Sequence, residues 1–527
     1  MNAQRFLLQS VLVDAAKLQN KVAVYDSDQP YSFKNLHLLS DKFALGLQRR
    51  GVLIGDRVVV CLGNRIECIV AFWGILKAGA VVVNVGIETT PEKLSFILKD
   101  SEASVLIADN KNIDCLADHI DDSTFIHSTI YVGERRLDNS FLGYEEIVSN
   151  SDVELIRVAI TDMDLAAIIY TSGSTGDPKG VMMTHKNMLS ALASLEAYLA
   201  YQQADVVLCS LPLSFDYGLY QMLMSIKTGA TLILEKAFTW PIFLIKKINQ
   251  YQVTILPLVP TMLSLLNEYA SRRAIRFESI RMVTNTGAAL KEIHVDMMKT
   301  LFPKAFIYSM YGLTECKRCT YLPPSDIDNK PESIGIAIPN TEVWLVDDED
   351  NRISDSDTVG ELVVRGSTVM AGYWNNPKAT EERLKAGPLS VENVLYTGDF
   401  CSMDADGYLY FKGRVDNVIK SRGMKVSPSE VEGYLYSIPA VEAAVIVGID
   451  DAEQGGALYG FVQLSQKEFT NSSKILELCR KNLEAHKVPK HIAIIKSLPR
   501  TGNGKFDVLA LDAIANREVQ SRRLKTM

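Results

Sequence analysis

Short apolar runs alternate with amphipathic stretches through the first two-thirds of the chain. An apolar run of about four to eight residues suits a buried strand, whereas apolar residues three and four apart indicate a helix. The predicted strands are 58–62, 80–85, 104–108, 206–211, 231–234 and 253–259, and the predicted helices are 65–78, 91–100, 218–226 and 241–250. Strands that alternate with helices predict an α/β fold, with parallel sheets covered by helices on both faces.

The pattern changes twice in the last third of the chain. Short strands separated by turn residues at 342–346, 360–365 and 408–412 indicate a β-rich, barrel-like subdomain. After residue 412 a separate α/β pattern begins, with strands at 443–447, 458–464 and 491–495 and a helix at 473–485. We therefore predict a large N-terminal domain over residues 1–412, with two parallel-sheet αβ units and this subdomain. A small mobile lid domain is predicted over 413–527, with a hinge near Asp416.

Composition and charge limit the classes of partner. The chain of 527 residues is 47% apolar and 22% charged, which suits a folded protein. Its net charge of −8, without a long basic run, argues against nucleic acid as a main partner. The longest uncharged apolar stretch, 253–266, contains two prolines and is too short to span a bilayer. Residues 1–20 fit one face of a helix rather than a signal segment.

The cysteines do not indicate a disulfide framework. There are eight in the whole chain, far fewer than in a disulfide-dense secreted domain. Cys316 and Cys319 form a lone CxxC pair with no second pair nearby, so we interpret them as reduced thiols rather than a zinc site. These features predict a cytoplasmic protein.

The run with the clearest chemistry is residues 170–180, Tyr-Thr-Ser-Gly-Ser-Thr-Gly-Asp-Pro-Lys-Gly. It follows a strand-like run at 165–169 and precedes a helix that begins near His185. Glycines let backbone N–H groups approach an anion, hydroxyls add donors and lysine adds charge, so the composition predicts a phosphate loop rather than a linker. The kinase-type P-loop needs four residues between its first glycine and Gly-Lys-Ser/Thr, and that spacing is absent here.

This run resembles the phosphate loop of the adenylate-forming superfamily, which comprises acyl-CoA synthetases, luciferases and the adenylation domains of nonribosomal peptide synthetases. Further motifs follow in the family's order, so the resemblance covers nearly the whole chain. It implies ATP or AMP contacts from Thr171, Ser172, Gly173, Ser174, Thr175, Gly176, Lys179, Gly287, Ala288, Ala289, Tyr311, Gly312, Asp399 and Arg414. Residues 370–374 are also similar to the family and are interpreted as structural.

The resemblance also implies roles for particular residues. Tyr311 stacks on adenine, Thr314 contacts phosphate and Glu315 holds Mg²⁺, while Asp399 and Arg414 contact the ribose. Among the implied catalytic residues, Thr314, Glu315 and Lys505, the lysine bridges the substrate carboxylate and the α-phosphate and so lowers their repulsion. The C-terminal domain then rotates about Asp416, and the hairpin near Gly423 approaches for thioester formation.

The pair Phe215-Asp216 carries the prediction about the substrate. It is similar to the pattern of amino-acid adenylation domains, whose aspartate receives the α-ammonium of the substrate. A buried carboxylate needs a cation, so a functional Asp216 implies a cationic substrate; alternatively, Asp216 caps the following helix. The implied pocket is lined by Phe215, Asp216, Tyr217, Tyr220, Thr284, Thr286, Met310 and Cys319. Lys317 and Arg318 are nearby in sequence and could face this pocket or solvent.

The chain has no condensation or carrier domain and resembles free-standing ligases that adenylate L-proline. The expected reaction uses ATP and Mg²⁺ to activate a small carboxylic or amino acid, with L-proline first. The acyl group then passes to a phosphopantetheine thiol on a separate carrier protein. Two alternatives stay open: a fatty or aryl acid–CoA ligase in which Asp216 caps a helix, and a non-catalytic nucleotide-binding relative.

Overall fold

The computed structural model divides the chain into two compact units. The first unit comprises Met1–Val343 and Val364–Tyr396, and the second comprises Trp344–Val363 and Thr397–Met527. The structure describes residues 6–109, 111–113, 126–133, 141–149, 155–156, 158–171, 178–236, 238, 240–287, 290, 292–414, 419–421, 424–426, 428–449, 456–465, 470–501 and 506–526. The predicted hinge at Asp416 lies outside these residues, so the hinge and the domain boundary after residue 412 stay predictions.

The first unit contains a nine-stranded sheet with the order β16-β15-β14-β13-β12-β10-β11-β1-β2. Its strands are β1 (Val22–Asp26), β2 (Gln29–Ser32), β10 (Val206–Cys209), β11 (Thr231–Leu234), β12 (Ile255–Leu258), β13 (Met282–Asn285), β14 (Phe306–Tyr311), β15 (Thr320–Leu322) and β16 (Ile336–Ala337). The strands from β14 to β1 pair in parallel, and β2, β15 and β16 are antiparallel additions at the two edges.

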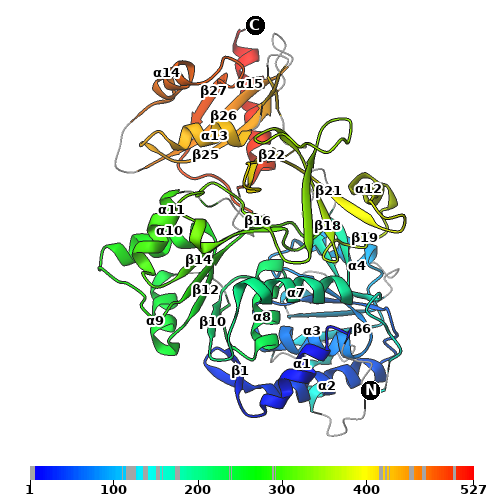
Figure 1. Cartoon of the computed structure of the whole chain (residues 1–527). Coiled ribbons are helices and arrows are strands. Elements are labelled where there is room, and N and C mark those ends of the chain that lie inside the picture. Colours follow the sequence, from blue (N-terminus) through cyan, green and yellow to red (C-terminus); the bar gives the residue numbers. More distant parts are fainter. Residues whose placement is uncertain are drawn as a thin grey trace. The chain divides into compact units, whose positions relative to one another are not determined.

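The connections of this sheet reverse direction at β10. From β10 the chain passes through α8 (Asp216–Thr228) to β11 on one side, and then through α9 (Pro241–Tyr251) to β12 on the other side. The helices α10 (Pro260–Ser271) and α11 (Glu292–Leu301) continue in that second direction. Right-handed crossovers therefore place α8 on one face and α9–α11 on the other, as Figure 1 shows. Ligands of open α/β sheets bind at the carboxyl ends of strands beside such a reversal.

A second, eight-stranded sheet of the first unit has the order β19-β9-β8-β4-β3-β5-β6-β7. Its strands are β3 (Arg57–Cys61), β4 (Val81–Val85), β5 (Val105–Asp109), β6 (Ser128–Val132), β7 (Leu142–Gly143), β8 (Leu165–Thr171), β9 (Lys179–Thr184) and β19 (Gly372–Tyr373). The remaining described helices of the unit are α1 (Ser10–Ala15), η2 (Ala16–Leu18), α2 (Phe33–Arg49), α3 (Ile66–Lys77), α4 (Pro91–Asp100), α6 (Tyr144–Val148), α7 (His185–Leu199), η3 (Pro324–Asp326) and α12 (Pro377–Arg383).

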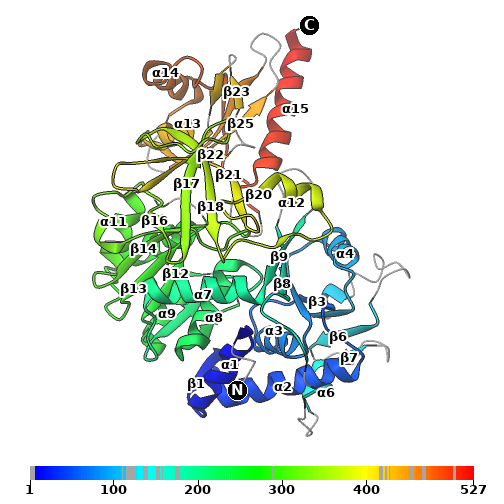
Figure 2. The same cartoon turned by 45° about the vertical axis from the view of Figure 1, so that its right-hand side comes forward.

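Two helices, α3 and α8, are buried on nearly all sides. Almost every residue of each is inaccessible to solvent, including the polar and charged ones. A helix buried all round lies within a core rather than on a surface. Figures 1 and 2 accordingly show α8 and α3 between the strands of the nine-stranded sheet and those of the eight-stranded sheet. Asp216, at the start of α8, is therefore held in a desolvated environment.

Short antiparallel strands follow in the last third of the chain. They form a five-stranded sheet with the order β17-β18-β21-β20, in which β22 also pairs with β21. The bounds are β17 (Thr341–Val346), β18 (Val359–Gly366), β20 (Leu384–Ala386), β21 (Asn393–Met403) and β22 (Leu409–Arg414). This sheet is the predicted β-rich subdomain.

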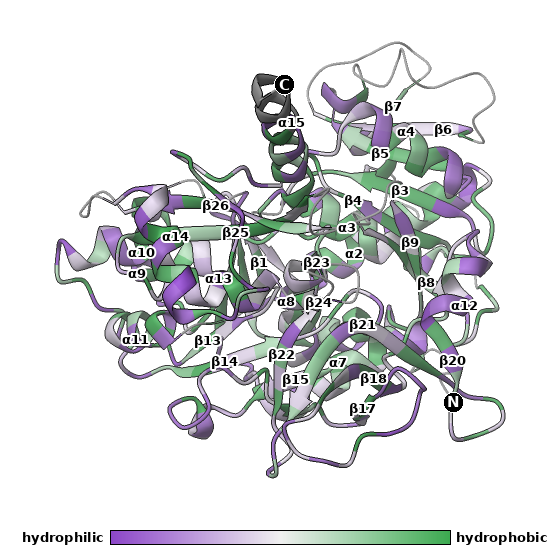
Figure 3. Ribbon diagram, turned by 90° about the horizontal axis from the view of Figure 1, so that it is seen from above, coloured by the Kyte–Doolittle hydropathy of each residue, from purple (hydrophilic) through white to green (hydrophobic). Residues whose placement is uncertain are grey.

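The second unit contains a small α/β core. Its elements are β23 (Ile419–Ser421), β24 (Met424–Val426), α13 (Pro428–Tyr436), β25 (Val441–Ile449), β26 (Ala457–Leu464), α14 (Ser472–Asn482), β27 (His491–Ile494) and α15 (Val508–Thr526). Alternate residues of β25 enter two different clusters, Ala444 and Ile446 on one face and Val445 and Val447 on the other. Figure 3 shows the matching hydrophobic colour along β25 and β26. Because side chains alternate across a strand, both faces of this sheet are covered.

The predicted fold class is confirmed. Each strand and helix of the alternating pattern is present within a few residues of its predicted bounds, and parallel sheets dominate the first unit. Among the described residues, no helix is both long and apolar enough to cross a membrane.

The start of α7 joins the N-terminal segment to the core. Thr184 and Asn187 form a capping box, in which each side chain accepts a hydrogen bond from the other's backbone N–H. The side chain of His185 turns inward, and its Nδ1 accepts a hydrogen bond from the backbone N–H of Leu8 at 3.1 Å. Burial lowers the pKa of His185 to about 4. The accepting role requires the neutral imidazole.

The first unit should therefore lose stability as the pH falls below about 6.5, the pKa of an unfolded histidine. Between that value and about 4 the unfolded chain binds the proton and the folded chain does not. The linkage predicts a loss of about 2 kcal/mol between pH 7 and pH 5. Urea unfolding at the two pH values should show this loss in the parent and in His127→Gln, an exposed control, but much less of it in His185→Gln. An equal loss in all three proteins would assign the effect to other groups.

Candidate active site

The predicted phosphate loop joins two antiparallel strands. Thr171 ends β8 and pairs with Lys179, the first residue of β9. Residues 172–177 lie outside the described part of the chain. The sequence pattern did not predict β9, because its six residues merge with the polar loop before them and the helix after them. The helix predicted near His185 is confirmed, and it begins after β9.

Lys179 and Tyr373 lie beside each other at the start of β9. The Lys179 Nζ atom lies 5.6 Å from the centre of the Tyr373 ring, a cation–π contact. Lys179 also lines a pocket of ≈ 300 Å³ with Phe96, Asp100, Trp374 and their neighbours. The lysine is therefore positioned by an aromatic side chain next to a hollow of the surface.

Tyr373 also holds Glu315, the predicted Mg²⁺ ligand. The Tyr373 hydroxyl donates to Glu315 Oε1 at 2.7 Å, and the backbone N–H of Met370 donates to the backbone oxygen of Glu315 at 2.8 Å. The interpretation of residues 370–374 as structural was therefore incomplete, because one of them contacts two predicted site residues. Nothing local in the sequence indicates this contact, since the two residues are 58 positions apart.

The loop after β14 folds back closely on itself at Gly312. A side-chain carbon at this position would lie 2.3 Å from the backbone oxygen of Lys317, so only glycine fits. Lys317 itself has a φ of 65°, an uncommon left-handed conformation for a residue with a side chain. This tight turn directs the side chains of both Lys317 and Arg318 inward. Neither faces solvent, since their residues are 0% and 5% exposed.

Asp216 has a cationic partner within the protein. The Lys317 Nζ atom lies 2.9 Å from Asp216 Oδ1, and the two side chains are 0% and 6% exposed. Burial lowers the pKa of Lys317, and the charge of Asp216 opposes this shift. The premise that Asp216 requires a cationic substrate is therefore wrong, because Lys317 already supplies the positive charge.

The other predicted pocket residues are brought together in the first unit. The Tyr217 hydroxyl donates to the backbone oxygen of Thr284 at 2.5 Å, and Met310 Sδ accepts from Tyr198 at 3.0 Å. A side-chain carbon at Gly287 would lie 3.7 Å from the Phe215 ring. The predicted residues that are buried here are Asp216, Tyr217, Tyr220, Thr284, Thr286, Met310 and Cys319. They lie on α8 and β14, at the carboxyl end of β13, or, for Cys319, in the loop between β14 and β15.

Cys319 lies against Cys316 in the same loop. Both are fully buried thiols, and their Sγ atoms are 3.3 Å apart with a thiol hydrogen bond between them. The backbone N–H of Cys319 donates to Tyr311, which closes the loop after β14.

The second unit brings together the two predicted ribose contacts. Asp399 on β21 is paired in register with Arg414 on β22, and the Arg414 Nε donates to Asp399 Oδ1 at 2.8 Å. The Asp399 side chain is 3% exposed whereas that of Arg414 is 50% exposed. Thr397 Oγ1 accepts from the backbone N–H of Asp399, which fixes the turn. Two residues that are 15 positions apart are thus adjacent, and their contact with the ribose stays a prediction.

Several predicted residues lie outside the part of the chain that the structure describes. They are Ser172, Gly173, Ser174, Thr175, Gly176, Ala288, Ala289, Asp416, Gly423 and Lys505. Their roles stay predictions.

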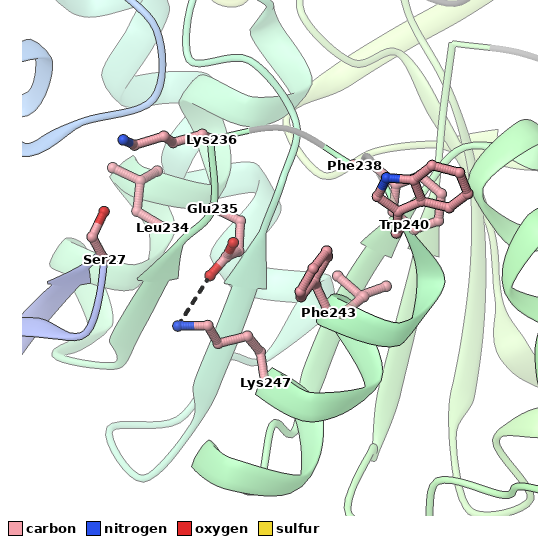
Figure 4. A pocket seen from close by; sticks show the side chains of 9 residues that line it. Ser27, Leu234, Glu235, Lys236, Phe238, Trp240, Phe243 and Lys247 are labelled. Atoms are coloured by element: carbon pink, nitrogen blue, oxygen red, sulfur yellow. Dashed lines mark ion pairs between the residues drawn. The ribbon is translucent and has the colours of Figure 1, made fainter.

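A second hollow of the first unit lies away from all the predicted site residues. It has a volume of ≈ 330 Å³ and lies where β11 ends and α9 begins (Figure 4). Trp240 and Phe243 are exposed at its rim, and Lys247 pairs with Glu235 across it at 3.4 Å. None of the predicted site residues lines this hollow, so it does not enter the assignment of the active site.

The sequence profile of AMP-binding enzymes matches residues 12–374, and the profile of their C-terminal domain matches residues 430–505. The chain belongs to the AMP-binding enzyme family. The predicted resemblance to adenylate-forming enzymes is thereby confirmed, whereas the narrower resemblance to proline ligases is not shown.

This AMP-binding enzyme is similar to known CoA ligases over most of its length. A long-chain-fatty-acid–CoA ligase of Escherichia coli O157:H7 is 30% identical over 521 residues, covering 93% of this chain and 91% of the relative. The 4-coumarate–CoA ligase 1 of Solanum tuberosum is 27% identical, covering 91% and 88%. The solved structure of o-succinylbenzoate CoA synthetase from Bacillus subtilis, in complex with its acyl-adenylate intermediate, matches with a TM-score of 0.81. It is 26% identical and covers 94% of this chain and 96% of that one.

Proposed function

We propose that this AMP-binding enzyme is an AMP-forming carboxylic acid–CoA ligase. The carboxylate of the acid attacks the α-phosphate of ATP, and pyrophosphate leaves to give an acyl-adenylate. The thiol of CoA then attacks the acyl carbon and releases AMP. Two of the relatives named above are CoA ligases of long-chain fatty acids and of 4-coumarate, which supports the same reaction here.

The ion pair between Lys317 and Asp216 is the observation that favours an acid–CoA ligase rather than an amino-acid ligase. A substrate ammonium would have to displace Lys317, which is fully buried and has no other carboxylate within hydrogen-bonding distance among the described residues. Leaving that lysine unpaired costs several kcal/mol. The acid is therefore one without an ammonium group, and the first expectation, L-proline loaded onto a carrier protein, loses its main argument.

The residues of each unit suit particular parts of the nucleotide. In the first unit, Tyr311 is proposed to stack on adenine, while Thr314 and Lys179 contact the phosphates. In the second unit, Asp399 and Arg414 are proposed to bind the ribose, since a carboxylate accepts from both ribose hydroxyls. Lys505 is proposed to bridge the two reacting anions.

The site fits a magnesium ion held partly by the substrate. Glu315 offers a carboxylate whose Oε1 is fixed by Tyr373. Among the described residues, no three His, Cys, Asp or Glu side chains cluster as a complete metal cage. Mg²⁺ commonly binds through one or two carboxylates together with phosphate oxygens and water. The bound ion would neutralise charge on the phosphates.

Tyr373→Phe should weaken the dependence on Mg²⁺ without removing any proposed ligand. The variant keeps the aromatic ring beside Lys179 but loses the hydroxyl that orients Glu315. Loss of such an orienting partner typically costs about 10–100-fold in metal affinity or activity. The Mg²⁺ concentration at half-maximal rate should rise accordingly, and Tyr410→Phe in the second unit serves as the control. If the dependence of the rate on Mg²⁺ concentration is unchanged, Glu315 is not a ligand of the metal ion.

Product analysis with a panel of acids tests the proposed reaction. The purified chain is incubated with ATP, Mg²⁺ and CoA, and with fatty acids of several lengths, benzoates, cinnamates and L-proline in turn. The proposal expects equal amounts of AMP and acyl-CoA with at least one acid that has no ammonium group. AMP formation with proline alone, together with thioester formation only on a phosphopantetheinylated carrier, would contradict it.

A further inference from the structure

Arg318 is a second cation beside the residues predicted to line the acid pocket, and among the described residues it has no anionic partner. Its residue is 5% exposed, and its Nη1 donates to the backbone oxygen of Lys317 at 2.7 Å. The guanidinium carbon lies 5.4 Å from the centre of the Tyr217 ring. The buried Nε has no hydrogen-bond partner. Among the described residues, no carboxylate pairs with Arg318, since Asp216 is taken by Lys317.

Among the described residues, another nearby carboxylate is that of Glu315, whose charge acts on Lys317 and whose Oε1 is held by Tyr373 rather than by Arg318. Tyr198, Tyr217 and Tyr220 all lie close enough to interact with its charge. Burial raises the pKa of each of these tyrosines well above its usual value, so the hydroxyls are neutral at physiological pH. Aromatic rings stabilise a cation only partly. Among the described residues, the guanidinium of Arg318 is therefore not neutralised by a carboxylate bonded to it.

We propose that the acid activated by this enzyme carries a second carboxylate, and that Arg318 binds it. This inference rests on the proposed acid–CoA ligase function and narrows its substrate class. A guanidinium presents parallel N–H groups that match a carboxylate, and the unpartnered Nε is one of them. A dicarboxylic acid would thus offer one carboxylate to ATP and the other to Arg318.

Two other occupants fit the pocket less well. A long hydrocarbon tail would lie against a desolvated and unpaired charge, which is unfavourable. If Arg318 held the reacting carboxylate instead, adenylation would remove the negative charge and leave the arginine unpaired in the intermediate. A second carboxylate keeps its charge through both half-reactions.

Pairs of acids of similar size test the proposal. Adipate is compared with heptanoate, and terephthalate with 4-ethylbenzoate, by measuring kcat/KM for acyl-CoA formation. The variants are Arg318→Met, which removes the charge and keeps the length, and Arg318→Lys, which keeps the charge and loses the fork. Arg272→Met is the control, because Arg272 is exposed and its ion pair in the described structure is with Glu268, four positions earlier in the chain.

The parent enzyme should prefer the dicarboxylic member of at least one pair by about tenfold or more. Arg318→Met should reverse that preference, Arg318→Lys should reduce it, and Arg272→Met should leave it as in the parent. A parent that prefers the monocarboxylate in both pairs would overturn the proposal. An equal loss for both members of a pair in Arg318→Met would also overturn it, since Arg318 would then bind the reacting carboxylate.

Two readouts do not require turnover and so separate this inference from the proposed function. Calorimetry without ATP should show tighter binding of the dicarboxylate to the parent, and no difference within the pair for Arg318→Met. Thermal unfolding of the free Arg318→Met variant should occur at the same or a higher temperature, because an unpaired buried charge is removed. If no acid forms AMP or a thioester, the proposed function fails, and the binding measurement still decides the inference. A lower unfolding temperature together with equal binding would assign Arg318 to a structural role.

Discussion

Replacing Lys317 with methionine should lower the free energy of unfolding of the first unit by about 3–5 kcal/mol. The side chain of Lys317 is fully buried, and its only described carboxylate partner, Asp216, is 6% exposed. Methionine fills a similar volume but leaves Asp216 as a buried carboxylate without its cation. The protein then has to desolvate that charge unaided or protonate it on folding.

The double variant Lys317→Met/Asp216→Asn separates loss of the pair from loss of packing. It should be more stable than Lys317→Met alone, because no uncompensated charge remains. The matched surface control is Lys299→Met, which removes the partner of Asp328 from an exposed ion pair. Exposed pairs contribute about 0–1 kcal/mol, so this control should change little.

Tryptophan fluorescence in urea measures these effects in the first unit. Trp344 belongs to the second unit, and the other three tryptophans of the chain belong to the first. A Trp344→Phe background therefore restricts the signal to the unit that contains the pair. A loss in Lys317→Met no larger than that in the Lys299 control would show that the buried pair is not formed in solution.

Replacing Lys505 with alanine should reduce the rate of acyl-adenylate formation by about 10²–10³. The attacking carboxylate and the α-phosphate are both negative, so a cation between them acts mainly where charge builds up in the transition state. Thioester formation from supplied acyl-adenylate should be retained, because that step no longer joins two anions. Lys496→Ala, an exposed lysine of the same C-terminal segment, is the control.

The two half-reactions are measured separately, adenylation by ATP–pyrophosphate exchange and transfer by acyl-CoA formation from synthetic adenylate. An exchange rate of Lys505→Ala within about tenfold of the parent rate corresponds to a difference of about 1.4 kcal/mol or less in activation free energy. That result would show that Lys505 does not bridge the two reacting anions. An equal fall in both half-reactions would indicate damage to the C-terminal domain instead.

Most of the fold could be predicted because the information for it is local. The apolar run 58–62 and the amphipathic stretch 91–100 correspond to β3 and α4 within one residue. The start of α7 follows from its capping box, which is encoded within Thr184–Asn187. The strand β9 was missed because a short strand beside a glycine-rich loop has no distinctive period of its own.

Candidate site residues could be predicted where they belong to a sequence motif. They could not be predicted where they depend on contacts between distant parts of the chain. Asp399 and Arg414 were assigned together from motif position and are paired in the structure. The partner of Asp216 was missed because Lys317 is 101 positions away, in a polar turn that looks solvent-exposed in sequence. Only the tight turn at Gly312 brings that lysine inside, and no periodicity reports such a turn.

An inhibitor that mimics the proposed acyl-adenylate of this protein should not need an amino group, whereas mimics made for amino-acid adenylating domains carry one. A stable mimic of an aminoacyl-adenylate presents an ammonium group, which at the proposed acid site would meet Arg318 and a carboxylate, Asp216, that Lys317 already occupies. The deamino mimic of the same shape is not repelled by Arg318 and loses less hydration on binding. A pair of compounds that differ by one amino group should therefore discriminate this enzyme from adenylating domains whose aspartate is free.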